Sequence, residues 1–374
     1  MIELATYFLA LAGTFLWWII VLVPWRPWNT LESLESVSHE NVPLDSITVL
    51  IPARNEGPLI KQTLNALSAQ DLNLKVIVID DQSDDDTAAQ AKSCGATVLS
   101  GTTPPLGWSG KLWALEQGLS KVDTPYTLLL DADITLTQGI VAALLKKARE
   151  ENLALVSLMA EPCLHRFIER LLMPAFVFFF KLLYPFQLAN KPGSRISAAA
   201  GGCILVETNA LRTVGAFASL HDALIDDCTL ASHIKHAGLQ TWIGLSHSAR
   251  SHRSYDDIKT IWNMVARTAY TQLHYSFLLL FICTMVMASM FWFAPLIPLL
   301  FPLGTIVMII GTLTWIAMAI VYAPLLRYYQ RSLLWIFALP IIGTLFLLMT
   351  WTSAFRFWRG ERAQWKNRRY EISA

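Results

Sequence analysis

The sequence predicts an α/β protein with a doubly wound, mostly parallel, Rossmann-like sheet between an N-terminal transmembrane anchor and C-terminal transmembrane helices. Three observations predict it. Between residues 45 and 276, short apolar strands alternate with helical segments, and this alternation is typical of parallel sheets with right-handed connections. Residues 4 to 23 carry no charge over a length that can cross a bilayer. From residue 277 the chain is apolar again.

Hydrophobic periodicity places the first elements of the sheet. Strands are expected at 46–53, 74–81, 96–100 and 126–133, and helices at 57–70, 84–95 and 111–122. The whole chain is 54% hydrophobic and 15% charged. It is therefore too apolar for an ordinary soluble enzyme, while its middle is too polar for a membrane bundle. No nucleic-acid partner is expected.

The two ends of the chain are predicted to lie in the membrane. Residues 1–26 are expected to be an uncleaved anchor, because Glu3 precedes the apolar stretch and no basic region or small-residue cleavage site accompanies it. The C-terminal transmembrane region is expected over 277–353. Its part from 277 to 325 is long enough for two spans, broken between Pro298 and Gly304.

Basic residues predict the topology. Arg327 and Arg331 mark a cytoplasmic loop, and a basic tail follows over 354–374. The basic residues near and in this tail are Arg356, Arg359, Arg362, Lys366, Arg368 and Arg369. A single span over 333–351 would put the tail outside. Because Pro340 and Gly343 interrupt that stretch, we expect it to be re-entrant or interfacial. The catalytic domain, 45–276, is then cytoplasmic in a multi-pass protein of the bacterial inner membrane. Five cysteines without a CxxC pair suit a reducing compartment.

Acidic residues follow two of the predicted strands. Asp80 and Asp81 end the second strand, and Asp131 and Asp133 follow "LLL" at the end of another. Open α/β sheets bind ligands at the carboxyl ends of their strands, so a site is expected there. Two alternatives stay open: Asp80 and Asp81 can cap the next helix together with Ser83, and an acid pair around a small residue also occurs by chance.

The spacing of Asp131 and Asp133 favours a metal site. Side chains two residues apart in a strand point to the same face, so both carboxylates can meet one ion. Oxygen ligands select a hard cation, Mg²⁺ or Mn²⁺, which keeps positions open for diphosphate oxygens.

The segment 167–190 is strongly apolar although it lies inside the polar part of the chain. Lys181, Pro174 and Pro185 argue against a full span, so a pair of interfacial helices is expected, with Phe178 to Phe180 docked in the membrane interface. Such helices would bring a lipid acceptor to the site. A buried core helix is the alternative.

Seven ordered motifs resemble the family 2 glycosyltransferases of the GT-A fold, within them the hopene-associated, membrane-anchored subgroup of bacteria. The motifs are "VLIPARNE", "VIVIDDQSDDDT", "GWSGKLWALEQG", "LLLDADI", "AAGGCILVETNALRTVGAF", "IDDCTLASHIKHAG" and "MVARTAYTQL". The similarity covers residues 46–275. The ending "WKNRRYEIS" also resembles the tail of lipid-directed relatives, with Asn367 in place of the usual glycine.

The resemblance implies a nucleotide-sugar site. Its residues would be Ala53, Glu56, Asp81, Lys111, Asp131 and Arg267. Asp81 would bind the base, Lys111 the nucleotide or diphosphate, and Asp131 with Asp133 would match the DxD pair that holds ribose and metal. Arg267 stands where the family has the arginine of QxxRW, but Thr268 replaces the tryptophan.

The resemblance also implies the acceptor and base residues. Asp227 matches the general base, with Asp226 beside it where glutamate is commoner, and Gly201 and Gly202 would form the floor under the acceptor. Helix capping by Asp227 and a strand-entry turn at the two glycines remain alternatives. His252 is a candidate additional metal or diphosphate contact, although most of the histidines are expected at the surface.

Together these observations predict a membrane-bound inverting glycosyltransferase. The donor would be a cytosolic nucleotide sugar, expected to be a UDP-sugar, the cofactor Mg²⁺ or Mn²⁺, and the acceptor a lipid hydroxyl in hopanoid metabolism. Two alternatives stay open. A processive polysaccharide synthase would carry an intact QxxRW and more spans, and an inactive membrane scaffold would have lost its acids, which are present at 81, 131, 133 and 227.

Overall fold

The computed structural model describes residues 2–36, 44–70, 74–221, 223–300, 305–361, 364–365 and 368–369. The chain forms two compact units. The sheet unit comprises Glu32–Cys163, Phe186–Ser254 and Arg362–Ala374, and the helical unit comprises Met1–Leu31, Leu164–Pro185 and Tyr255–Glu361. Residues 164–185 and 255–276, which the sequence grouped with the catalytic domain, therefore pack within the helical unit.

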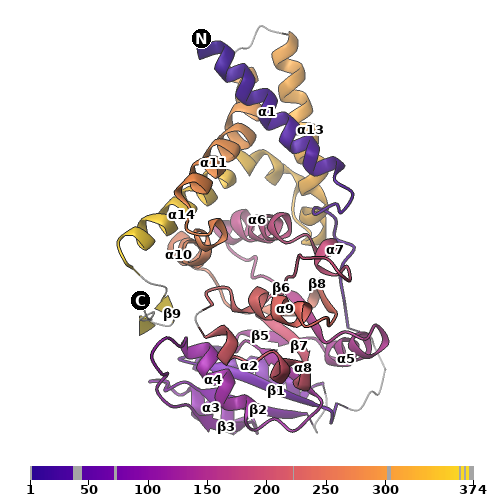
Figure 1. Ribbon diagram of the computed structural model, residues 1–374, viewed down its shortest axis with the longest axis vertical. Coiled ribbons are helices and arrows are strands. Elements are labelled where there is room, and N and C mark those ends of the chain that lie inside the picture. The colour runs from indigo at the N-terminus through magenta and orange to yellow at the C-terminus, as the bar shows by residue number, and fades with distance from the viewer. Residues whose placement is uncertain are drawn as a thin grey trace. The chain divides into compact units, whose positions relative to one another are not determined.

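An eight-stranded sheet forms the centre of the sheet unit, in the order β3-β2-β1-β4-β7-β6-β8-β5 (Figure 1). The strands are β1 Ile47–Ala53, β2 Lys75–Asp80, β3 Thr97–Ser100, β4 Tyr126–Leu130, β5 Ile134–Leu136, β6 Leu155–Glu161, β7 Cys203–Glu207 and β8 Thr241–Ser251. Strands β1 to β4 pair in parallel, as do β6 and β8, whereas β7 runs antiparallel to both of its neighbours and β5 antiparallel to β8. The predicted GT-A sheet is confirmed, with its second half mixed. A separate pair, β9 Gln364–Trp365 and β10 Arg368–Arg369, is antiparallel.

Helices cover both faces of the sheet because the side chains of its strands alternate between two cores. Val49 and Ile51 of β1 pack into one core with α2 and α5, while Leu50 packs into the other with α4, α8 and α9. The helices of this unit are α2 Gly57–Ser68, α3 Thr87–Ser93, α4 Gly110–Leu119, α5 Ile140–Glu150, α7 Phe186–Ala189, α8 Thr208–Thr213, η1 Ala218–Leu220 and α9 Asp226–His236. Each fully buried Leu or Ile contributes about 1.5 to 3 kcal/mol to this packing.

Among its described residues, the helical unit contains four stretches that are long and apolar enough to cross a membrane: Ala5–Leu22, Phe277–Pro298, Thr305–Tyr328 and Leu333–Trp358. Its elements are α1 Ile2–Leu22, α6 Phe167–Leu183, α10 Ile258–Thr268, η2 Thr271–Leu273, α11 Phe277–Ala288, η3 Ser289–Phe293, α12 Ala294–Leu300, α13 Thr305–Tyr328, η4 Leu333–Ala338 and α14 Leu339–Trp358. The predicted anchor is a helix long and apolar enough to cross a membrane, and so are the two helical stretches expected within 277–325.

Gly343 does not interrupt the last apolar stretch, so that part of the prediction is wrong, whereas Pro340 lies where η4 is followed by α14. Pro340 lies in the first turn of α14, where a backbone N–H would lack an intrahelical partner in any case. Gly343 lies inside the helix, and a Cβ atom there would come within 2.4 Å of the Phe291 ring. The glycine therefore allows close helix packing.

The predicted docking of Phe178 in the membrane interface is also wrong. Phe178 is 1% exposed. Its ring packs on Trp17 of α1 at 6.5 Å and on Tyr322 of α13 at 5.3 Å between centroids, and Phe179 lies 4.7 Å from Phe346 of α14. Apolar periodicity does not distinguish a helix face that meets lipid from one that meets other helices, because both neighbours are apolar.

Candidate active site

The acidic residues gather at one edge of the sheet because β1, β2 and β4 are parallel and end side by side. The N–H of Asp81 donates to the carbonyl of Ala53 at 2.8 Å, which joins the ends of β2 and β1. The N–H of Asp131 donates to the carbonyl of Gly202 at 3.0 Å, just before β7. Asp81 and Asp131 thus lie at the carboxyl end of the sheet, as predicted from the sequence.

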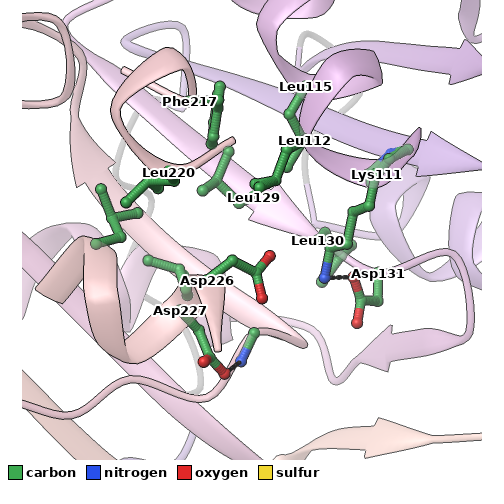
Figure 2. Close-up of a pocket in the computed structure, with 14 residues that line it drawn as sticks. Lys111, Leu112, Leu115, Leu129, Leu130, Asp131, Phe217, Leu220, Asp226 and Asp227 are labelled. Carbon is green, nitrogen blue, oxygen red and sulfur yellow. Dashed lines mark hydrogen bonds and ion pairs between the residues drawn. The ribbon is translucent and has the colours of Figure 1, made fainter. Parts of the chain in front are cut away.

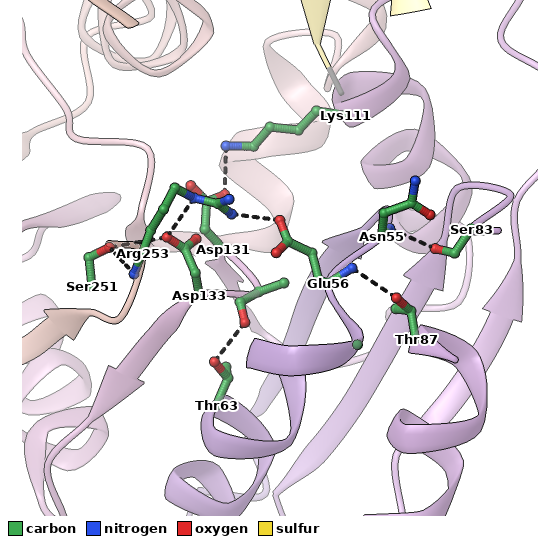
Figure 3. Close-up of polar contacts among 12 residues, drawn as sticks. Asn55, Glu56, Thr63, Ser83, Thr87, Lys111, Asp131, Asp133, Ser251 and Arg253 are labelled. Carbon is green, nitrogen blue, oxygen red and sulfur yellow. Dashed lines mark hydrogen bonds and ion pairs between the residues drawn. The ribbon is translucent and has the colours of Figure 1, made fainter. Parts of the chain in front are cut away.

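Lys111 neutralises Asp131. It lies in the first turn of α4, and its Nζ is 2.7 Å from Asp131 Oδ1 (Figure 3). Burial lowers the Lys111 pKa, but the carboxylates of Asp131, Asp226 and Asp227 outweigh burial, so this pKa is raised above its usual range. Lys111 is therefore a permanent cation at this edge of the sheet.

Arg253 forms the corresponding ion pair with Asp133. Its Nε lies 3.1 Å from Asp133 Oδ2, and its Nη2 lies 2.6 Å from Glu56 Oε1 (Figure 3). Ser251 Oγ donates to the same Asp133 oxygen at 3.1 Å. Arg253 is not among the site residues predicted from the sequence. A signal was available, because the arginine follows the end of a strand, β8, as the acidic residues follow theirs.

The DxD carboxylates suit a divalent cation, since each already accommodates a positive charge from this chain. Mg²⁺ is commonly held by one or two carboxylates together with phosphate oxygens and water. Within the described ranges, the structure brings no group of three or more His, Cys, Asp or Glu side chains together as a metal cluster. His252 Nε2 is 2.5 Å from Thr135 Oγ1, so its role as a third ligand stays a prediction.

The loop after β1 and the end of β2 hold the expected nucleotide residues. Asp81 is 1% exposed, and Arg54 Nη1 donates to its backbone carbonyl at 2.5 Å. The N–H of Glu56 donates to Thr87 Oγ1 at 2.8 Å. Helix α3 begins at Thr87 with Asp86 as its N-cap residue. Asp80 and Asp81 are therefore not the caps of that helix.

Asp226 and Asp227 begin α9 and line a pocket with Lys111 and Asp131 (Figure 2). Its apolar wall includes Leu112, Leu115, Leu129, Phe217, Leu220 and Leu230. Asp227 Oδ2 accepts a hydrogen bond from the N–H of Gly201 at 2.8 Å, and its Oδ1 accepts one from the N–H of Cys228, also at 2.8 Å. The first bond comes from another element, so Asp227 is more than a local helix cap.

The environment shifts the pKa of Asp227 upward. Removal from water and the adjacent Asp226 carboxylate raise this pKa to about 6. The N–H groups of Cys228 and Gly201 and the charge of Lys111 act in the opposite direction without cancelling the rise. A carboxylate with a pKa near 6 accepts protons better than an ordinary aspartate.

Gly201 was expected to lie under the acceptor, but in the structure it lies next to the side chains of Asp227 and Lys111. A Cβ atom on Gly201 would lie 3.3 Å from Asp227 Oδ2 and 3.5 Å from Lys111 Nζ. A Cβ atom on Gly202 would lie 3.4 Å from the Ile134 side chain. Gly201 thus admits the Asp227 carboxylate, and the acceptor role of both glycines stays a prediction. Arg267 lies on α10 of the helical unit, and its role also stays a prediction.

Comparisons with known proteins agree with a GT-A fold. Residues 48–215 match the family model described as glycosyl transferase family 2. A mannosyltransferase of Pyrobaculum calidifontis, solved with GDP-Man and Mn²⁺, shares the fold with a TM-score of 0.58 at 17% identity, over 96% of this chain and 99% of that chain.

Curated relatives are similar over a shorter region. The 4,4'-diaponeurosporenoate glycosyltransferase of Staphylococcus haemolyticus (strain JCSC1435) is 30% identical over 45% of this chain and 40% of its own length. The protein of the same name from Staphylococcus aureus (strain MRSA252) is 38% identical over 27% of this chain and 28% of its own length. The chain therefore spans less than half the length of these relatives.

Proposed function

We propose that this protein is a membrane-bound, inverting glycosyltransferase that moves a sugar from a nucleoside-diphosphate sugar to a lipid. The observation that carries the proposal is a pocket that Asp131 of the first acid set lines together with Asp226 and Asp227 of the second. Asp131 and Asp133 are held by cationic side chains, whereas Asp227 is held by amides beside an apolar wall. The first set suits a metal and a diphosphate, and the second suits a base.

The donor half of the site follows from the charges. Asp131 and Asp133 would hold Mg²⁺ or Mn²⁺, which when bound offsets the charge of the leaving diphosphate. Lys111 and Arg253 form ion pairs with these two carboxylates, and this supports a role in which they meet the phosphate oxygens of the donor. Asp81 and Glu56 would support the base and ribose. We take a UDP-sugar as the first donor to test.

The acceptor half follows from Asp227. Its carboxylate would accept the proton of the acceptor hydroxyl as that oxygen attacks the anomeric carbon on the side opposite the diphosphate. Such a single displacement inverts the configuration of the anomeric carbon. The bonds from Gly201 and Cys228 fix the orientation of the carboxylate, and positioned proton transfer of this kind contributes about 10² to 10⁴ in rate.

A lipid acceptor is supported by the helical unit. Four stretches of this unit are long and apolar enough to cross a membrane, and the curated relatives act, by name, on 4,4'-diaponeurosporenoate, a carotenoid acid. The sequence resemblance to the hopene-associated subgroup makes hopanoid alcohols the first acceptors to test. We propose a location in the bacterial inner membrane with the sheet unit in the cytoplasm.

The test is transfer by purified protein in liposomes, with labelled UDP- and GDP-sugars offered against hopanoid, carotenoid and bulk bacterial lipids. The expected product is a lipid carrying one sugar, identified by mass, with the anomeric configuration opposite to that of the donor. The Asp227→Asn protein is the matched control. A polymeric product would indicate a processive synthase. Donor binding without turnover on any acceptor would indicate an inactive scaffold.

A further inference from the structure

The last apolar stretch, Leu333–Trp358, can be followed relative to the other helices of the helical unit. Helices α1 and α13 run in the same direction, because Ala10 packs with Ile310 and Thr14 Oγ1 lies 2.7 Å from Thr314 Oγ1. Both therefore end on one side of the unit. We call this side the near face, and it contains the ends of α1 at Leu22 and of α13 at Tyr328.

Helix α11 begins at the near face and runs away from it. Trp17, close to the end of α1, donates from Nε1 to the carbonyl of Met290 at 2.9 Å. Ala10, further from that end, packs with Ile297. The chain therefore moves away from the near face between Met290 and Ile297. Phe277, at the start of α11, lies on the near-face side of Met290.

Helix α14 runs antiparallel to α11 along its length. Thr344 Oγ1 accepts from Trp292 Nε1 at 2.7 Å, and Thr284 Oγ1 accepts from Trp351 Nε1 at 3.0 Å. The rings of Trp358 and Phe277 are 6.1 Å apart. As the residue number rises along α14, it falls by nearly the same amount along η3 and α11. Helix α14 therefore ends at the near face.

The stretch also begins at the near face. It follows α13 after the short segment 329–332, and within six residues Phe337 of η4 reaches Trp315, with ring centroids 5.2 Å apart. Trp315 lies near the middle of α13. The chain thus enters as η4, turns near Pro340 at about half the depth of α13, and returns as α14. Figure 1 shows α14 starting well short of the far ends of α1 and α13.

Charges support the same path. Arg327 and Arg331 precede the stretch, and Arg356 and Arg359 lie at its end. A crossing helix would divide these arginines between the two sides of the membrane. A stretch that turns back places all four at the near face, which agrees with the rule that basic flanks gather on the cytoplasmic side.

We propose that Leu333–Trp358 is a re-entrant hairpin, so three of the four apolar stretches cross the bilayer and the fourth inserts into one leaflet. Its exposed side is apolar, with Phe337 65%, Ile341 61%, Leu348 48% and Phe355 51% exposed. Lipid of the near-face leaflet alone covers this surface. The inference does not depend on the proposed chemistry, because only packing within the helical unit supports it.

The first test measures depth. Spin labels at Ile341, Leu348 and Phe355 are compared with one at Ile316 in the middle of α13, using the full chain in liposomes with its native cysteines replaced. A hairpin gives the order Ile341, Leu348, Phe355 from deep to shallow, with Ile341 as deep as Ile316. Ile341 and Phe355 are about 20 Å apart along the helix axis. A crossing helix would instead make Leu348 as deep as Ile316.

The second test needs no cysteine-free protein. Ser332→Cys, Glu361→Cys and, as the far-side control, Thr305→Cys are treated with an impermeant maleimide in sealed vesicles of known orientation. Peptide mass spectrometry assigns each label to its position, so the native cysteines remain. The hairpin predicts that positions 332 and 361 label from one side and 305 from the other. Labelling of 361 together with 305 overturns the proposal.

Discussion

The candidate active site contains two pairs of acidic residues, and the two pairs are held by different groups. Asp131 and Asp133 each contact a cationic side chain, Lys111 at 2.7 Å and Arg253 at 3.1 Å. Asp227 instead accepts two backbone N–H groups, each at 2.8 Å, beside an apolar wall. Under the proposed function, the first pair exchanges its cations for others, whereas Asp227 accepts and releases a proton.

The difference follows from where each pair stands in the chain. Asp131 and Asp133 follow a parallel strand, and the cations reach them from α4 and from the end of β8. Asp226 and Asp227 begin α9, opposite the backbone of Gly201. The two acid sets therefore meet different groups, side-chain cations in the first and backbone N–H groups in the second, as a division of roles between an electrostatic group and a base would require.

The largest expected effect is loss of the first pair. Asp133→Ala should lower transfer by about 10³-fold or more and remove the Mn²⁺ dependence of nucleotide binding, because a metal ligand is lost. Calorimetric titration of nucleotide with and without Mn²⁺ measures it. Asp123→Ala is the control, since that carboxylate forms an exposed pair with Lys75 at 2.7 Å. Unchanged Mn²⁺ dependence would contradict the metal assignment.

Asp227→Asn should lower turnover by about 10²-fold while donor affinity stays within about twofold, because the amide keeps the shape of the side chain without its basicity. Turnover and calorimetric donor binding on one preparation separate the two effects. If the variant keeps more than half of the turnover, Asp227 is a structural residue. This test uses an acceptor with a hydroxyl group, because an acceptor that is already ionised, such as a carboxylate, needs no base.

The raised pKa of Asp227 gives a pH dependence. The base must be ionised, so turnover should fall as the pH drops through about 6 and should be full above it. Because the Asp226 charge helps to raise this pKa, Asp226→Asn should move the acidic limb to lower pH. Rate profiles from pH 4.5 to 8 for both proteins test this, with Asp227→Asn showing no such limb. An unmoved limb would exclude coupling between the two acids.

The sequence predicted the first half of the fold and one acid pair well, because these depend on local patterns. The period of apolar residues places β1, β2 and β4, and parallel pairing then brings Asp81 and Asp131 to one edge. The contact between Arg253 and Asp133 was not predictable in this way. It depends on the antiparallel register of β5 with β8, whose residues are far apart in the chain.

Two other features depended on partners that no local pattern identifies. The apolar residues of α6 suit lipid and protein equally, and only the fold shows Phe178 between Trp17 and Tyr322. The sequence indicated that another group approaches Gly201 closely, but it did not identify that group. The residue that approaches it is Asp227, through a hydrogen bond between segments that the sequence separates.

Arg253→Gln tests whether the first pair exchanges its cations. Without the guanidinium, Asp133 should bind Mn²⁺ more tightly in the absence of nucleotide, while affinity for the donor should fall by about 10-fold, or 1.4 kcal/mol. Mn²⁺ titration by electron paramagnetic resonance and donor calorimetry measure the two. Arg250→Gln is the matched control, because Arg250 forms its ion pair with Glu161, which belongs to neither acid pair. Weaker binding of both ligands would indicate a structural role for Arg253.

The smallest expected effect concerns the second pair. In Gly201→Ala, the new Cβ would lie 3.3 Å from Asp227 Oδ2 and 3.5 Å from Lys111 Nζ, so the carboxylate must shift by a few tenths of an ångström. The hydrogen bond from the residue 201 N–H would lengthen, and because that bond favours the ionised form, the Asp227 pKa should rise further. Turnover at pH 7 should fall by about fivefold, since hydrogen bonds to charged groups are worth about 1.5 to 3 kcal/mol and are only weakened here. The acidic limb of the rate profile should move to higher pH.

Gly202→Ala provides the comparison for this variant. Its Cβ would meet the Ile134 side chain at 3.4 Å, close to ordinary contact, and would leave Asp227 in place. Its pH profile should therefore keep the wild-type limb even if the rate changes. Equal shifts in the two variants would mean that the backbone before β7 moves as a whole. A shift confined to Gly201→Ala would show that the N–H of this residue sets the pKa of Asp227. Backbone control of this kind would distinguish Asp227 from Asp131 and Asp133, which are paired with side-chain cations.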